Sequence, residues 1–162
     1  MKVIVPGSFD PVTLGHLDVI RYAVGVADEV YAVVFINENK KYRFPIEDRV
    51  RMLTLATEEL THVTVSYSTG RVVDYMREHG ITKIIKGYRN DADLKWERYQ
   101  ADYNFEHGGY ETELVECTGE HKELSSTLVR ERLDAGLEIS ELVPPRVAEY
   151  IKEFSNLTER KK

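Results

Sequence analysis

Apolar residues along the chain gather in five short runs separated by longer mixed segments. Each run is rich in Val and Ile and lacks the strict polar–apolar alternation of a strand with one wet face. Such runs are typical of strands that are covered on both faces of a sheet. They predict strands at residues 2–6, 28–36, 63–66, 83–86 and, with fewer apolar positions, 113–116.

The segments between these runs carry apolar residues at helical spacing. Leu17, Ile20, Val24 and Ala27, for example, fall on one stripe of a helix. Gly80 stands where a left-handed residue usually ends a helix. The pattern predicts helices at residues 15–27, 45–60, 72–79, 91–106, 126–135 and 145–154, followed by a frayed tail at 155–162.

Strands that alternate with helices predict an α/β fold. We expect a single doubly wound domain over residues 1–162, with a five-stranded parallel sheet covered by helices on both faces. In sheets of this kind, ligands bind beyond the carboxyl ends of the strands, near the point where the strand order reverses. A polar motif that directly follows a strand is therefore a candidate for ligand binding.

The composition narrows the class of protein. Of the 162 residues, 42% are hydrophobic and 31% are charged, which excludes intrinsic disorder, and a single Cys excludes a disulfide framework. No apolar run approaches the roughly 20 residues of a membrane span, and no secretory signal is recognisable, so we expect a cytoplasmic protein without membrane contact. The net charge of −6 argues against nucleic-acid binding. Small anionic ligands remain compatible with it, because physiological salt screens charges beyond about 8 Å.

The loop after the first strand, residues 6–16, is the first candidate site. Gly7 permits close backbone approach, Ser8 offers a hydroxyl, and His16 falls in the first turn of the next helix. Backbone N–H groups and the positive end of the helix dipole make such a junction a site for anions. The alternative is a tight turn with a solvent-facing His. Neither the dinucleotide fingerprint nor the P-loop pattern is present.

Three further loops follow strands at the same edge of the sheet. Residues 37–44 carry three basic side chains, residues 86–93 carry Lys86 and Arg89, and residues 121–130 carry a cluster of hydroxyls that opens a helix. The alternatives are a solvated charged loop, a lysine with a buried stem, and a helix N-cap. Four strand ends with phosphate-compatible groups nevertheless indicate a nucleotide or another phosphorylated ligand.

The opening P-G-S-F-D-P-x-T-x-G-H resembles the signature of bacterial phosphopantetheine adenylyltransferases, members of the nucleotidyltransferase superfamily with T/H-x-G-H motifs. The resemblance covers residues 1–153, in the family's order. Its other motifs are Asn37-x-x-Lys40-x-x-x-Phe44, Glu47-x-Arg49, Gly87-x-Arg89, Asp93-x-x-x-Glu97 and Leu124-Ser125-Ser126-Thr127-x-Val129-Arg130.

The resemblance implies a Rossmann-like nucleotidyltransferase fold and a Mg²⁺-dependent reaction. ATP and 4′-phosphopantetheine would give dephospho-coenzyme A and pyrophosphate, the penultimate step of coenzyme A biosynthesis. The Mg²⁺ ion would be held mainly through the ATP phosphates, with no protein metal ligand. The resemblance also implies a homohexamer and allows coenzyme A as a feedback ligand.

Site residues carry over by position. Ser8 should contact both substrates, and His16 should be the catalytic residue at the α-phosphate. Lys40, Val72 and Lys86 should bind the acceptor together with Ser8. The ATP site should comprise Ser8, Phe9, His16, Gly87, Tyr88, Arg89, Glu97, His121, Lys122, Glu123, Leu124, Ser125, Ser126 and Thr127.

The chain departs from the family pattern at three places. The family usually has Arg where this chain has Lys86, Trp or Tyr where it has His121, and a more apolar stretch where it has residues 102–110. One alternative function is a related transferase acting on nicotinate mononucleotide or glycerol 3-phosphate. Another is a nucleotide-binding regulatory module without turnover. Lys40 together with Lys86 favours a terminal phosphate on a flexible acceptor.

Overall fold

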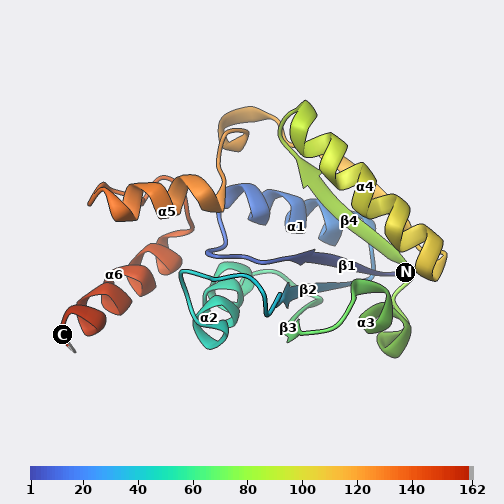
Figure 1. Ribbon diagram of the computed structural model, residues 1–162, viewed down its shortest axis with the longest axis horizontal. Coiled ribbons are helices and arrows are strands. Elements are labelled where there is room, and N and C mark those ends of the chain that lie inside the picture. Colours follow the sequence, from blue (N-terminus) through green and yellow to red (C-terminus); the bar gives the residue numbers. More distant parts are fainter. Residues whose placement is uncertain (161–162) are drawn as a thin grey trace.

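The computed structural model describes residues 1–160 and has five strands that alternate with helices (Figure 1). All five predicted strands are confirmed. Their bounds are β1 (Lys2–Gly7), β2 (Glu29–Phe35), β3 (Val63–Ser68), β4 (Lys83–Tyr88) and β5 (Glu111–Glu116). The helices are α1 (Leu14–Val26), α2 (Ile46–Thr57), α3 (Val72–His79), α4 (Asp91–Gly108), α5 (Ser126–Asp134) and α6 (Pro145–Arg160), with one 3₁₀ turn, η1 (Gly119–His121).

The strands form one sheet in the order β3-β2-β1-β4-β5, and every neighbouring pair is parallel. The chain starts in the middle of the sheet, builds outward to β3, and crosses back to build β4 and β5 on the other side of β1. The strand order therefore reverses between β1 and β4. The predicted doubly wound α/β sheet is confirmed, and ligands are expected beyond the carboxyl ends of these two strands.

The two faces of the sheet are covered differently. On one face, Val3, Val5 and Ile85 belong to a large buried cluster that includes residues of α1, α2, α5 and α6. On the other face, Ile4 and Ile84 pack with residues of α3. The helix α4 lies beside β4 on this second side (Figure 1), but none of its residues is buried. The second face is thus covered only in part.

The last helix is longer than predicted. It ends at Arg160 rather than at residue 154, so the expected frayed tail is helical as far as residue 160, and residues 161 and 162 lie outside the described part of the chain. The Phe154 ring packs against Phe44 at 5.2 Å between centroids. No Gly or Pro follows Phe154 in the sequence to end the helix there. Within residues 1–160, no helix combines the length and the apolar character that crossing a bilayer requires.

Candidate functional site

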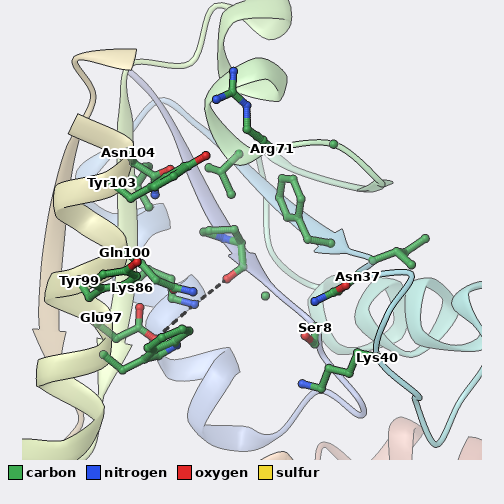
Figure 2. Close-up of a pocket in the computed structure, with 18 of the residues that line it drawn as sticks. Ser8, Asn37, Lys40, Arg71, Lys86, Glu97, Tyr99, Gln100, Tyr103 and Asn104 are labelled. Carbon is green, nitrogen blue, oxygen red and sulfur yellow. Dashed lines mark hydrogen bonds and ion pairs between the residues drawn. The ribbon is translucent and has the colours of Figure 1, made fainter. Parts of the chain in front are cut away.

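Two cavities meet at the carboxyl ends of β1 and β4. The larger, about 930 Å³, lies over the sheet face between α3 and α4, and the smaller, about 390 Å³, lies between the start of α1 and residues 121–130. Figure 2 shows the larger cavity with Ser8 and Lys40 on one side and Lys86 and Glu97 on the other. The residues that line both cavities are Pro6, Gly7, Ser8, Lys40, Lys86 and Glu97.

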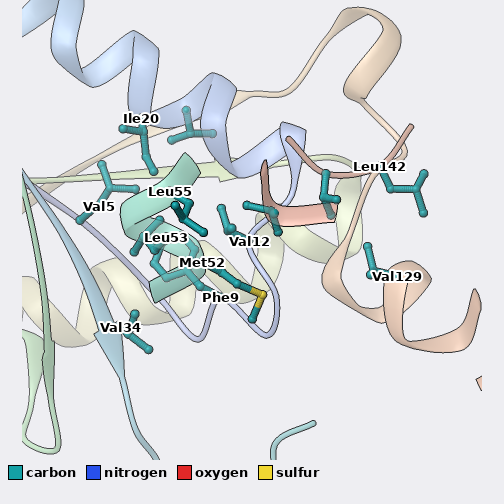
Figure 3. Close-up of a cluster of buried hydrophobic side chains, with 14 of the residues drawn as sticks. Val5, Phe9, Val12, Ile20, Val34, Met52, Leu53, Leu55, Val129 and Leu142 are labelled. Carbon is teal, nitrogen blue, oxygen red and sulfur yellow. The ribbon is translucent and has the colours of Figure 1, made fainter. Parts of the chain in front are cut away.

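The loop after β1 is anchored by its own apolar residues. Phe9 and Val12 bury their side chains in the large core cluster (Figure 3). The carboxylate of Asp10 is also buried, and it accepts hydrogen bonds from the backbone N–H groups of Arg43 and Phe44 at 2.8 and 2.9 Å. These bonds join the loop after β1 to the loop after β2. Phe9 also lines the smaller cavity, although its side chain is only 2% exposed.

His16 is held in one orientation by the residue that caps its helix. The backbone N–H of Thr13 donates to His16 Nδ1 at 3.0 Å, and the His16 N–H in turn donates to Thr13 Oγ1 at 3.3 Å. Since Nδ1 accepts a hydrogen bond from the backbone N–H of Thr13, the neutral ring carries its own proton on Nε2. Burial, followed by the positive charges of Lys86 and Arg89, lowers the pKa of His16 to about 4. At neutral pH the ring is therefore an uncharged hydrogen-bond donor at the cavity wall.

Lys86 is fixed at the wall between the two cavities. Its ammonium lies 3.3 Å from the carbonyl oxygen of Pro6 and 3.6 Å from Glu97 Oε1 (Figure 2). Burial raises the pKa of Glu97, and the charge of Lys86 opposes that shift. The ion pair links the end of β4 to α4 and leaves the ammonium at the place where the cavities join.

Arg89 and Gly87 complete the end of β4. Asp93 accepts a hydrogen bond from the Arg89 backbone N–H at 3.2 Å and forms an ion pair with the guanidinium, whose Nε lies 3.0 Å from the same carboxylate. A Cβ on Gly87 would stand 2.6 Å from Val19 Cγ2 and 3.0 Å from Cys117 Sγ. Only Gly therefore lets α1 pack this closely against β4.

Residues 119–130 close the smaller cavity on the side away from the sheet. His121 Nδ1 lies 2.6 Å from the Asp18 carboxylate on α1. Ser125 caps α5 by accepting from the Leu128 N–H at 3.1 Å, which confirms the N-cap alternative for this hydroxyl. Ser126 Oγ donates to the carbonyl oxygen of Pro11 at 2.7 Å. The start of α5 is thus tied directly to the loop after β1.

The structure brings most of the expected site residues together. Ser8, Lys40, Val72 and Lys86, expected for the acceptor, all line the larger cavity. Of the residues expected for ATP, those that line the smaller cavity are Ser8, Phe9, His16, Gly87, Arg89, Glu97, His121, Leu124, Ser125, Ser126 and Thr127. Tyr88, Lys122 and Glu123 line neither cavity, and their contact with ATP stays a prediction.

One wall of the larger cavity was not anticipated from the sequence. It is formed by residues on one side of α4, and Arg71 lies across from them at the start of α3 (Figure 2). These residues recur three or four positions apart, so they share one face of the helix. That spacing was the available signal, but the residues are polar or aromatic and do not form an apolar stripe. They are Trp96, Tyr99, Gln100, Tyr103 and Asn104.

The side chains do not assemble a metal cage. Among the described residues, no group of three or more His, Cys, Asp or Glu side chains is placed to hold a metal ion. The Asp10 carboxylate faces backbone N–H groups, and Glu97 faces Lys86.

Comparison with known proteins identifies the family. Residues 4–132 match the model of the cytidylyltransferase-like family. A phosphopantetheine adenylyltransferase from Thermobifida fusca is 38% identical over 151 residues, which are 93% of this chain and 92% of the relative. Another from Streptomyces coelicolor is 39% identical over 94% of this chain and 96% of the relative. The chain belongs to the cytidylyltransferase-like family and, within it, to the phosphopantetheine adenylyltransferases.

Proposed function

We propose that this protein transfers the adenylyl group of ATP to 4′-phosphopantetheine, which gives dephospho-coenzyme A and pyrophosphate. The observation that carries the proposal is the junction of two cavities at a shared wall that contains Ser8, Lys40 and Lys86. One cavity suits the nucleotide, and the other suits a long acceptor whose terminal phosphate reaches that wall. Two lysines and a backbone turn at this point favour the meeting of two phosphate groups.

The reaction needs no protein nucleophile. An oxygen of the acceptor phosphate attacks the α-phosphorus of ATP, a new P–O bond forms, and the bond from the α-phosphorus to pyrophosphate breaks. The Nε2–H of His16 donates a hydrogen bond to the α-phosphate oxygens as negative charge builds there. Burial raises the pKa of the Cys117 thiol, which keeps it protonated and inert. The protein acts by positioning the phosphates and stabilising charge.

Mg²⁺ is proposed as the cofactor, bound through the ATP phosphates. There it would neutralise part of the phosphate charge. Lys40, Lys86 and Arg89 face the cavities and would supply the remaining positive charge. Excess chelator should therefore abolish turnover, and added Mg²⁺ should restore it.

A homohexamer in the cytoplasm is also proposed, with coenzyme A as a ligand that competes for the acceptor cavity. Exposed aromatic side chains on α4 support self-association: Phe105, 58% exposed, lies outside both cavities, whereas Trp96 and Tyr99, 57% and 65% exposed, also line the larger cavity. Large aromatic side chains gathered on one helix are a common feature of subunit interfaces. Analytical ultracentrifugation would measure the assembly directly.

Pyrophosphate release tests the proposed function. The purified protein is given ATP and Mg²⁺ with 4′-phosphopantetheine, nicotinate mononucleotide or glycerol 3-phosphate in turn. We expect pyrophosphate release with 4′-phosphopantetheine and no release with the other two acceptors. Release with one of the other acceptors would identify a related transferase, and binding of ATP without release would identify a regulatory module.

A further inference from the structure

Tyr42 lies in the loop after β2, between the Lys40 side chain and the buried residue Arg49. The centroid of its ring is 3.8 Å from the Arg49 guanidinium carbon and 5.6 Å from Lys40 Nζ. Its hydroxyl accepts a hydrogen bond from the backbone N–H of Asn37 at 2.9 Å. The ring also lines the larger cavity. The hydroxyl of Tyr42 therefore contacts Asn37, and its ring contacts Lys40, within the same loop.

Arg49 gives the ring a fixed support. This residue is only 2% exposed, although it is charged. Its Nε donates to the carbonyl oxygen of Phe44 at 3.0 Å, and its Nη1 donates to that of Ser8 at 3.1 Å. A planar guanidinium held at two corners has one orientation, and the Tyr42 ring lies against this fixed group, with its centroid 3.8 Å from the guanidinium carbon. The Tyr42 ring is thus tied to the loop that carries Ser8.

The Lys40 side chain has few other interactions that fix its position. Among the described residues, its ammonium makes no hydrogen bond and no ion pair, and its contact with the Tyr42 ring is within the roughly 6 Å at which a cation is attracted to an aromatic face. A lysine side chain has many rotamers, and fixing them costs entropy. A contact that favours the rotamers pointing at the cavity raises the fraction of protein ready to bind phosphate.

We propose that Tyr42 is a positioning residue for Lys40. Supported by Arg49, it holds the Lys40 ammonium at the wall that the two cavities share, and it couples the position of Lys40 to that of Ser8. The inference rests on the proposed function, because it assigns Tyr42 a role in binding the reacting phosphates. Tyr42 does not touch them; it acts through Lys40.

Substitution of the ring gives a first test. Tyr42→Leu removes the aromatic face, whereas Tyr42→Phe keeps it and removes only the hydroxyl. We expect kcat/KM for 4′-phosphopantetheine to fall about two- to fivefold in Tyr42→Leu, the effect of one exposed cation–aromatic contact. Tyr42→Phe should retain most of the wild-type value. Tyr67→Leu is the matched control, because Tyr67 is 59% exposed and lines neither cavity.

A double-mutant cycle separates positioning from a merely structural role. If Tyr42 acts through Lys40, Tyr42→Leu should have no further effect on kcat/KM once Lys40→Met has removed the ammonium. An equal loss in both backgrounds would overturn the proposal, as would wild-type kinetics in Tyr42→Leu. Should Tyr42→Leu fail to fold, Tyr42→pentafluorophenylalanine keeps the shape of the ring and removes its attraction for cations; unchanged kinetics there would overturn the proposal too.

Pyrophosphate release by the wild-type protein distinguishes a failure of the proposed function from a failure of the role of Tyr42. Absence of pyrophosphate release by the wild type with 4′-phosphopantetheine would contradict the proposed function. Normal release by the wild type, together with additive effects of Tyr42→Leu and Lys40→Met, would contradict only the role of Tyr42.

Discussion

The two cavities differ in how firmly their walls are held. In the smaller cavity, His16, Arg89 and His121 each have a side-chain or backbone partner that sets their orientation. On the α4 wall of the larger cavity, Gln100 and Asn104 make no side-chain hydrogen bond among the described residues. The Tyr99 side chain on the same wall is 65% exposed. One cavity is arranged before any ligand arrives, and the other retains unused polar groups.

This difference matches the demands of the reaction. Groups that stabilise charge in a transition state are effective only when they are already in place, because reorienting them costs free energy during the reaction. Groups that bind the remote part of an acceptor can become ordered on binding, at a cost in affinity but not in the chemical step. Changes in the smaller cavity should therefore lower turnover, and changes on the α4 wall should weaken acceptor binding.

The largest effect is expected at His16. His16→Ala removes the donor to the α-phosphate, and the typical loss for one transition-state donor is about 10²- to 10³-fold in turnover. ATP affinity should change much less, because the donor acts mainly as charge builds. Steady-state kinetics with circular dichroism as a check on folding would measure this. Near wild-type kcat in the folded variant would show that the smaller cavity does not carry the chemistry.

Lys86 lines both cavities, so its substitution tests whether acceptor binding and turnover are divided between them. Lys86→Met keeps the apolar stem and deletes the charge. Loss of a charged hydrogen bond costs roughly 1.5–3 kcal/mol, or about ten- to a hundredfold in affinity for the acceptor. Lys86→Arg should retain binding, since a guanidinium also pairs with phosphate.

Calorimetric titration with 4′-phosphopantetheine and with ATP would give both affinities. Lys95→Met is a suitable control, because Lys95 is exposed on α4 and lines neither cavity. Unchanged acceptor affinity in Lys86→Met would mean that Lys40 or Arg89 holds the acceptor phosphate.

The same contrast explains what could be predicted from the sequence. The buried strands and the helices that carry apolar stripes were predictable, because burial imposes a period on the residues. Ile20 on α1 lies in the core as expected, and Leu53 on α2 lies there too (Figure 3). The loop after β1 was predictable because its motif is local. The α4 wall was not, because a helix without buried residues has no apolar stripe from which its inner face can be identified.

Contacts between side chains that are far apart in the sequence could not be predicted from the sequence either. Asp18 and His121 are separated by 103 positions, and only the fold brings their side chains together. The support that Arg49 gives to Tyr42 and to Ser8 has the same origin. A buried Arg in an amphipathic helix looks like a surface residue until its partners are known.

The low pKa of His16 predicts a smaller effect, on stability. The folded pKa of about 4 lies below the ordinary 6.5, so the unfolded chain takes up a proton in this interval while the folded protein does not. The resulting stabilisation is complete above pH 6.5 and is lost as the pH falls toward 4. Because the ring is only half-buried, we expect wild type to lose roughly 1–2 kcal/mol more than His16→Gln between neutral pH and about pH 5.

Urea unfolding at several pH values would measure this difference. His62→Asn is the control, since His62 is exposed and Asn tolerates its φ of 62°. A parallel pH dependence in wild type and His16→Gln would show that the ring is not held neutral, and that its orientation in the smaller cavity is not fixed in advance.

A small effect is expected on the α4 wall, at Gln100. The Gln100 amide lines the larger cavity without a partner among the described residues, so an acceptor that fills the cavity can supply one. Removal of a neutral hydrogen bond costs about 0.5–1.5 kcal/mol. Gln100→Ala should thus raise KM for 4′-phosphopantetheine about two- to tenfold and leave kcat and KM for ATP within error. Glu106→Ala, exposed on the same helix and outside both cavities, should match wild type. A fall in kcat for Gln100→Ala would place an α4 side chain in the chemical step and would contradict the division of roles between the two cavities.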